Sequence, residues 1–140
     1  MKINIGPYRK NRAFHIRIDD YDVWNLDDTL AHIIHPALIR LRETKQGYPE
    51  LWEDGMEPKF SNQLAFDFVD FDEQDKYLEK KWNNVMSTMI RAFGLIIHRE
   101  AHEDAANKSD KGYLKYMLEY YKAVDKGLTL FARHYHALWD

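Results

Sequence analysis

Residues 82–102 read WNNVMSTMIRAFGLIIHREAH, and this stretch decides the fold class. Its large apolar side chains recur every three or four residues, which is the spacing of one face of an α-helix. They are Trp82, Val85, Met86, Met89, Ile90, Phe93, Ile96 and Ile97. We therefore predict one long helix from about Asp75 to His102, in which Gly94 is a local weak point.

Two further stretches show the same helical spacing. The first begins near Asn25 or Asp27, either of which can cap a helix, and ends at Gly47-Tyr48-Pro49. Within it, Pro36 lacks a backbone amide and predicts a kink. The other runs from about Tyr113 to Ala137, and its expected buried face consists of Tyr116, Met117, Tyr120, Tyr121, Val124, Leu128, Phe131 and Tyr135.

The N-terminal residues alternate between polar and apolar side chains, which is the pattern of a half-buried strand. Lys2–Ile5 and Phe14–Ile18 both show it, and a turn signal at Gly6-Pro7 follows the first. These patterns predict a mainly α protein of α+β character: a small helical bundle of three principal helices with a short N-terminal β-hairpin. We expect Trp24, His35 and Trp139 to have structural roles.

The length of 140 residues predicts a single domain over 1–140. Residues 50–71 are irregular and contain Gly55 and Pro58, so we expect a mobile insertion there. The absence of cysteine excludes a disulfide scaffold and any site with cysteine ligands. No stretch resembles a signal peptide or a membrane span, which predicts a soluble cytosolic protein without membrane association.

Charge is distributed unevenly along a chain of net charge −3. Residues 1–18 carry five basic side chains and no acidic one, whereas residues 50–79 carry ten acidic side chains and two lysines. A basic N-terminus can contact phosphate, but the whole chain is acidic and has no basic helix face. Nucleic acid is therefore not the favoured partner.

Histidines provide the main candidates for metal chemistry. His98 and His102 are four residues apart, so that both imidazoles lie on one side of a helix, and His35 precedes the proline of an earlier helix. These three residues are the candidates for a metal-dependent hydrolase. The pattern lacks the HExxH arrangement and a third ligand nearby, so solvated or core histidines are the favoured interpretation and no metal, cofactor or catalytic residue is expected.

A few residues are better candidates for contact with a ligand or a partner. Tyr8, Tyr48 and Trp52 are aromatic residues outside the apolar stripes of the predicted helices. Arg9 and Arg12 lie in the basic N-terminal segment. Aromatic and arginine side chains are enriched in binding surfaces, so these five residues are the predicted binding residues.

Five stretches towards the two ends of the chain form a recognisable set: Ile16–Asp19, Tyr21–Leu30, Ile33–Leu38, Gly47–Pro49 and the ending Leu130–Asp140. In these stretches the chain resembles a family of small proteins encoded by tailed bacteriophages. The ending departs from the family pattern at Ala132, Arg133 and His134. The resemblance implies a phage origin, expression in the host cytoplasm and an accessory role in counter-defence, host takeover or assembly. It implies no activity and no catalytic residues.

The function predicted from these observations is non-enzymatic binding of a host or phage protein by a homo-oligomer. Self-association is expected because the aromatic-rich helices offer more apolar surface than a three-helix monomer covers. Two alternatives stay open: an oligomeric binder that sequesters a small nucleotide-like ligand, and a metal-dependent hydrolase that uses His35, His98 and His102.

Overall fold

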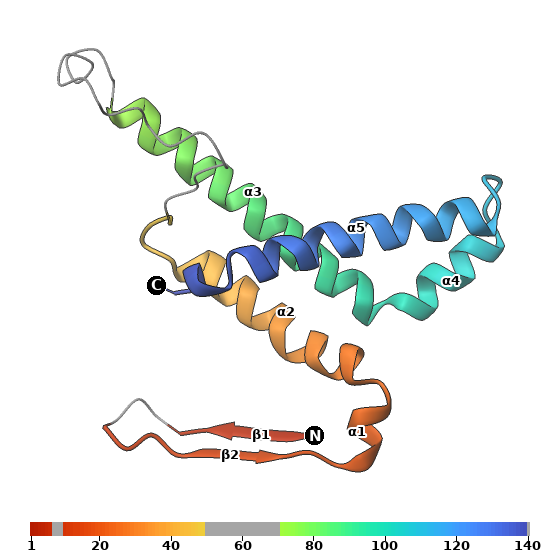
Figure 1. Ribbon diagram of the computed structural model, residues 1–140, viewed down its shortest axis with the longest axis horizontal. Coiled ribbons are helices and arrows are strands. Elements are labelled where there is room, and N and C mark those ends of the chain that lie inside the picture. Colours follow the sequence, from red (N-terminus) through yellow and green to blue (C-terminus); the bar gives the residue numbers. More distant parts are fainter. Residues whose placement is uncertain (7–9, 50–70, 140) are drawn as a thin grey trace.

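The computed structural model describes residues 1–6, 10–49 and 71–139. The chain begins with an antiparallel hairpin and continues as a series of helices (Figure 1). In order, the elements are β1 (Lys2–Ile5), β2 (Phe14–Arg17), α1 (Asp20–Trp24), α2 (Leu26–Thr44), α3 (Phe71–Ile97), α4 (Arg99–Asn107), α5 (Tyr113–Arg133) and the 3₁₀ helix η2 (Tyr135–Ala137). The predicted fold class is confirmed: the protein is mainly α, with α2, α3 and α5 as principal helices and a short N-terminal hairpin.

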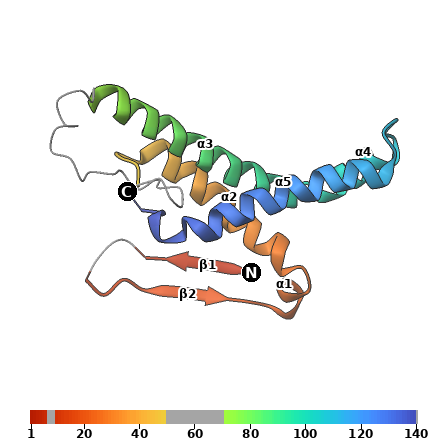
Figure 2. The same cartoon turned by 45° about the horizontal axis from the view of Figure 1, so that its top comes forward.

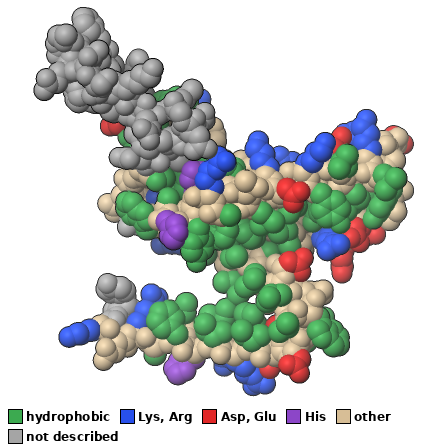
Figure 3. Space-filling model, viewed as in Figure 1, with side chains coloured by type: hydrophobic (Ala, Val, Ile, Leu, Met, Phe, Trp, Pro, Cys, Tyr) green, Lys and Arg blue, Asp and Glu red, His purple; other side chains and the backbone are tan. Residues whose placement is uncertain are grey.

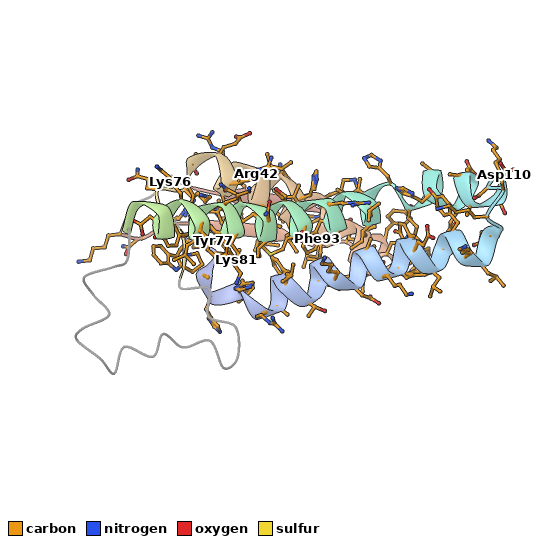
Figure 4. All side chains as sticks on the ribbon, turned by 90° about the horizontal axis from the view of Figure 1, so that it is seen from above. Arg42, Lys76, Tyr77, Lys81, Phe93 and Asp110 are labelled. Carbon is orange, nitrogen blue, oxygen red and sulfur yellow. The ribbon has the colours of Figure 1, made fainter. Side chains whose placement is uncertain are left out.

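Helix α3 is the centre of the bundle, because it packs against both α2 and α5. Its buried residues follow the spacing seen in the sequence, and the largest are Trp82, Met86, Met89, Ile90 and Phe93. Ala31 and Leu38 of α2 join this core. Phe131 of α5 meets Phe93 edge-on, with ring centroids 5.1 Å apart, and Figure 4 shows Phe93 between the two helices. Burying each large side chain in such a core contributes about 1.5–3 kcal/mol.

Two glycines lie where the helices approach most closely. A Cβ atom on Gly127 of α5 would lie only 2.1 Å from Cβ of Ala92 on α3 and 2.9 Å from the carbonyl oxygen of Thr88. A Cβ atom on Gly94 of α3 would lie 3.3 Å from Nε2 of His35 on α2. Both glycines weaken their own helices locally, but their missing side chains let the three principal helices pack closely.

The predicted single helix from Asp75 to His102 is wrong at its C-terminal end. Helix α3 ends at Ile97 and α4 begins at Arg99, because His98 between them has φ −102° and ψ 24°. The break allows α4 to change direction and to pack on α5 (Figure 1). That packing creates a second buried cluster, consisting of Ala106, Met117, Tyr120 and Val124. Helical spacing does not reveal the break, because it continues on both sides of His98.

Two other element boundaries differ from the prediction. The short helix α1, which was not predicted, begins at Asp20, and the Asp19 amide donates to Oδ2 of Asp22 at 2.9 Å. The last helix ends at Arg133 rather than at Ala137, and the chain continues as the 3₁₀ helix η2. Both differences arise at helix ends, where local hydrogen bonds compete with the regular helical pattern.

The hairpin has one apolar and one polar face. Strands β1 and β2 pair antiparallel, with Ile3 opposite Ile16 and Ile5 opposite Phe14, so these four side chains share a face. The opposite face carries Lys2, Asn4, His15 and Arg17. Among the described elements neither strand packs on a helix, and Figures 1 and 2 show the hairpin standing apart from the bundle.

Several large side chains that were predicted to be buried are exposed. The expected structural role of Trp24 and Trp139 in the core is wrong, because Trp24 is 80% exposed and Trp139 is mostly exposed. Tyr121 and Leu128 of α5 and Tyr135 of η2 are exposed although their spacing predicts burial. The reason is that α3 and α4 cover α5 on one side only, so the buried face of α5 is narrower than its apolar stripe.

The predicted mobile insertion at 50–71 lies outside the described residues except for Phe71, which begins α3. Residue Tyr48 and the end of α2 precede this segment directly. None of the helices in the described ranges combines the length and the apolar character needed to cross a membrane.

Candidate functional site

Of the five predicted binding residues, Tyr8, Arg9 and Trp52 lie outside the described residues. Arg12 lies in the connection between the two strands. Its Nε donates to the carbonyl oxygen of Gly6 at 2.8 Å, and its guanidinium lies over the ring of Phe14, 5.7 Å from the centroid. These contacts help to close the hairpin.

Tyr48 connects the end of α2 to the beginning of α3. Its ring packs against the core, and its hydroxyl donates to Oδ1 of Asp75 at 2.5 Å. This hydrogen bond to the carboxylate raises the pKa of Tyr48. Arg12 and Tyr48 therefore support local structure in different parts of the molecule, and a binding role for either stays a prediction.

The three histidines of the hydrolase alternative lie in different surroundings. His35 faces Gly94 between α2 and α3, and His98 lies at the break before α4. His102 lies with Nδ1 3.0 Å from the hydroxyl of Tyr116. Within residues 1–6, 10–49 and 71–139, no group of three or more histidine, cysteine or carboxylate side chains is placed to hold a metal ion.

An acidic cleft of about 610 Å³ lies where the N-terminal end of α2 meets the break between α3 and α4. Two of its side chains already have partners: Nδ1 of His32 lies 3.5 Å from Oδ2 of Asp28, and Nε of Arg99 donates to Oε1 of Glu103 at 3.1 Å. The hydrogen bond that Arg99 donates to Glu103 raises the pKa of Arg99. With Asp27 and Glu100 also in its wall, the cleft attracts basic groups.

Helix α4 and the first half of α5 form an arm that extends beyond the α2–α3 packing, with Asp110 at its tip (Figure 4). The hydroxyl of Tyr120 donates to the carbonyl oxygen of Leu95 at 3.0 Å, and burial raises the pKa of this tyrosine. A cavity of about 180 Å³ lies beside the bond between His102 and Tyr116. These contacts fix α5 against α3 and α4, and so decide which side of α5 faces solvent.

That solvent side of α5 carries an apolar stripe, which we call the α5 stripe: Leu114, Leu118, Tyr121 and Leu128. The spacing of four, three and seven residues places all four on one side of the helix. Leu114 is 83% exposed and Leu118 is 54% exposed. In Figure 3 apolar side chains follow the bundle at the level of α5, with basic side chains along their upper border.

A row of lysines runs beside the α5 stripe. The lysine row consists of Lys115, Lys122 and Lys126, which are exposed and share one side of α5. None of the three forms an ion pair within the described part of the chain, whereas Glu119 is already paired with Lys111 at 3.2 Å. The α5 stripe therefore combines apolar side chains with a positively charged border, and the exposed Asp125 interrupts it between Tyr121 and Leu128.

Comparison with protein-family models, with curated proteins and with solved structures finds no match to this chain. The candidate site rests on the geometry of the chain itself.

Sequence analysis missed the α5 stripe, because it assigned Tyr121 and Leu128 to the buried face of the last helix. The signal that could have found it is the pair Leu114 and Leu118, which are four residues apart and of which Leu118 directly follows the buried Met117. An apolar pattern that covers two faces of a helix indicates that one face packs in the core and that the other is available to a different surface.

Proposed function

We propose that this chain is a bacteriophage accessory protein that acts in the host cytoplasm by binding a host or phage protein, without catalysing a reaction. The observation that carries the proposal is the α5 stripe, an apolar helix face that the fold leaves in solvent. Contiguous exposed apolar surface is unusual on a monomeric protein and is typical of interaction surfaces. The resemblance of both ends of the chain to tailed-phage proteins supports the proposed origin.

The partner that fits the α5 stripe is an amphipathic helix with an apolar face and an acidic border. Side chains of a helix repeat at three and four residues, so an apolar helix face can lie along Leu114, Leu118 and Tyr121. The acidic border would meet the lysine row, which adds specificity and speeds association. Tyr121 and Leu118 lie at the centre of the stripe, where interfaces concentrate their binding energy.

A second copy of the chain is a poor occupant of the α5 stripe. If two α5 helices paired antiparallel about a two-fold axis, their lysine rows would lie on the same side of the pair. Like charges at that distance repel, and Asp125, the unpaired acid that the described residues place on this side of α5, does not balance the three lysines of each copy. The proposed partner is therefore a different protein.

The proposal is tested by photo-crosslinking in infected cells. A photoreactive amino acid replaces Leu118 in one strain and Lys80, an exposed residue of α3, in a control strain. We expect a specific crosslink from position 118 alone, to a segment whose sequence has apolar residues at helical spacing and acidic neighbours. Equal crosslinking from both positions, or none from position 118, would contradict the proposal.

The captured protein is then purified and its affinity is measured. We expect Leu118→Ala to weaken binding about tenfold, which is the loss of a central interface side chain. Lys122→Glu should also weaken binding, whereas Lys80→Glu makes the same charge change on α3 and should have little effect. Unchanged affinity in Leu118→Ala and in Lys122→Glu would show that the protein binds elsewhere.

A further inference from the structure

The hairpin presents a second uncovered apolar surface, separate from the α5 stripe. We define the hairpin face as Ile3, Ile5, Phe14, Ile16 and Ile18, whose exposed fractions lie between 38% and 61%. A two-stranded hairpin is only marginally stable in water unless its apolar face packs on another strand or a helix. Since neither strand packs on a described helix, the described part of one copy leaves the hairpin face without a cover.

The same chain also carries an apolar surface that could complement the hairpin face. We define the α2 stripe as Leu26, Leu30 and Ile33, which share one side of α2 and are exposed. Ile3 and Ile33 stand on opposite walls of a groove of about 380 Å³ at the base of the hairpin. Figure 3 shows apolar side chains on both sides of the open space between the hairpin and the bundle.

The base of the hairpin is held by contacts that keep these two surfaces apart. The amino group of Met1 forms an ion pair with Asp22 of α1 at 2.6 Å. The backbone carbonyl of Asp22 accepts a hydrogen bond from the hydroxyl of Thr29, in the first turns of α2, at 3.1 Å. One α1 residue thus ties β1 to α2 and sets the separation within a chain, whereas nothing restricts the same two surfaces on different chains.

We propose that a second copy of this chain covers the hairpin face, with the hairpin of each copy lying on the α2 stripe of the other in a two-fold symmetric dimer. The dimer joins the hairpin face and the α2 stripe, two surfaces that do not meet within a single chain. Two-fold symmetry then forms the contact twice. Because it uses another surface, this proposal goes beyond the function proposed for the α5 stripe.

The area available matches what a stable dimer needs. Taking roughly 150–250 Å² for a large apolar side chain, the hairpin face, the α2 stripe and the neighbouring Val23 and Trp24 expose on the order of 1,000 Å² per copy. A stable interface typically buries about 800 Å² per partner. Trp24 lies against Tyr21, with ring centroids 5.9 Å apart, and tryptophan and tyrosine are the residue types that dominate interface energies.

Charge also favours the exchange. Residues 1–18 carry five basic side chains and no acidic one, whereas residues 19–39 carry five aspartates and no lysine or arginine. Some of these charges are already used within the chain, because Arg17 pairs with Asp19 at 3.0 Å and Asp22 pairs with the amino group of Met1. Lys10, in the connection between the strands, forms no ion pair in the described ranges, so it is available to the acidic segment of a second copy. Opposite charges would meet twice in the dimer.

The first test is the mass in solution, measured by light scattering at about 50 μM protein. We expect the mass of two chains for the unaltered protein. Ile16→Asp places a charge on the hairpin face and should give monomers, whereas His15→Asp places the same charge on the opposite face and should leave the dimer intact. Circular dichroism should show unchanged helix content in both variants, since the hairpin does not pack on the bundle. A monomeric unaltered protein, or equal effects of both variants, would overturn the proposal.

The second test uses the absence of cysteine from the chain. Ile5→Cys and Leu30→Cys are prepared separately, mixed and treated with a short bis-maleimide linker. We expect linked pairs that contain one chain of each variant, and far fewer when Asn4→Cys on the polar face replaces Ile5→Cys. If a chain with both cysteines becomes linked only within itself, the hairpin closes on its own α2 and the proposal is wrong. Neither test needs a target protein, so failure here leaves the function of the α5 stripe to its own experiments.

Discussion

At the scale of single residues, Gly127 is the position where the packing of α3 against α5 leaves no space for a side chain. Gly127→Ala would place a methyl group 2.1 Å from Cβ of Ala92, so the two helices must separate. We expect the free energy of unfolding to fall by about 1–3 kcal/mol, the usual range for overpacking a core. Urea denaturation measures this change.

The matched control is Gly47→Ala, because a Cβ atom at Gly47 meets nothing within 4 Å. We expect its free energy of unfolding to change by no more than about 0.5 kcal/mol. Similar losses of stability in both variants would show that the close approach of Gly127 to Ala92 does not cause the loss in Gly127→Ala.

His134 makes stability depend on pH. Its imidazole packs edge-on against Trp82, with ring centroids 5.5 Å apart. Burial, and then the charge of Arg133, lower the pKa of His134 below its ordinary value of 6.5. As the pH falls through about 6.5, the unfolded chain therefore binds the proton before the folded protein does, and the free energy of unfolding decreases.

The measurement is chemical unfolding at a series of pH values for the unaltered protein and for His134→Phe. We expect the phenylalanine variant to lose less stability between about pH 7 and pH 5, because it cannot bind the proton there. Parallel profiles would show that this ring has the same pKa in the folded and unfolded states.

At the scale of the elements, the rotation of α5 about its own axis decides which residues are core and which form the α5 stripe. Met117 is buried in the second cluster, and its neighbour Leu118 faces solvent. Met117→Ala should lower the free energy of unfolding by about 2–5 kcal/mol. Leu118→Ala should change it by about 0.5 kcal/mol or less. Urea denaturation of the two variants compares them directly, and the opposite order would mean that α5 presents its other side to solvent.

The hairpin shows how far an element can be predicted without its surroundings. Alternation of polar and apolar residues predicts both strands correctly, because side chains of a strand point alternately to its two faces. The same pattern implies that one face is buried, yet the structure leaves Ile16 and Phe14 exposed. In the proposed dimer, a second copy of the chain buries the face that the alternation predicts to be buried.

At the scale of the whole molecule, the proposed dimer makes the stability of the hairpin depend on protein concentration. Amide hydrogen exchange of β1 and β2 should slow as the concentration rises through the dissociation constant, because binding protects the bound form by mass action. Amides in the middle of α3 should exchange at the same rate throughout. Hairpin exchange that is fast and independent of concentration would mean that no second copy covers this surface.

The candidate site was less predictable than the fold. Of the residues expected to bind, Arg12 and Tyr48 make local contacts, and the other three lie outside the described residues. Spacing alone did not separate the α5 stripe from the core, because its leucines and tyrosine repeat at the same intervals as core residues. Only the packing of α5 on α3 and α4 separates the two faces.

The sequence by itself determined the helices, the hairpin and most of the core. Those features depend on the spacing of apolar residues along a short stretch, as in Trp82 to Phe93, and spacing is a local property. Tertiary structure alone decided the break at His98, the exposure of Trp24 and the free side of α5. Each of these depends on packing between segments far apart in the chain, where burial of one cluster outweighs the local preference for a continuous helix or a buried aromatic ring.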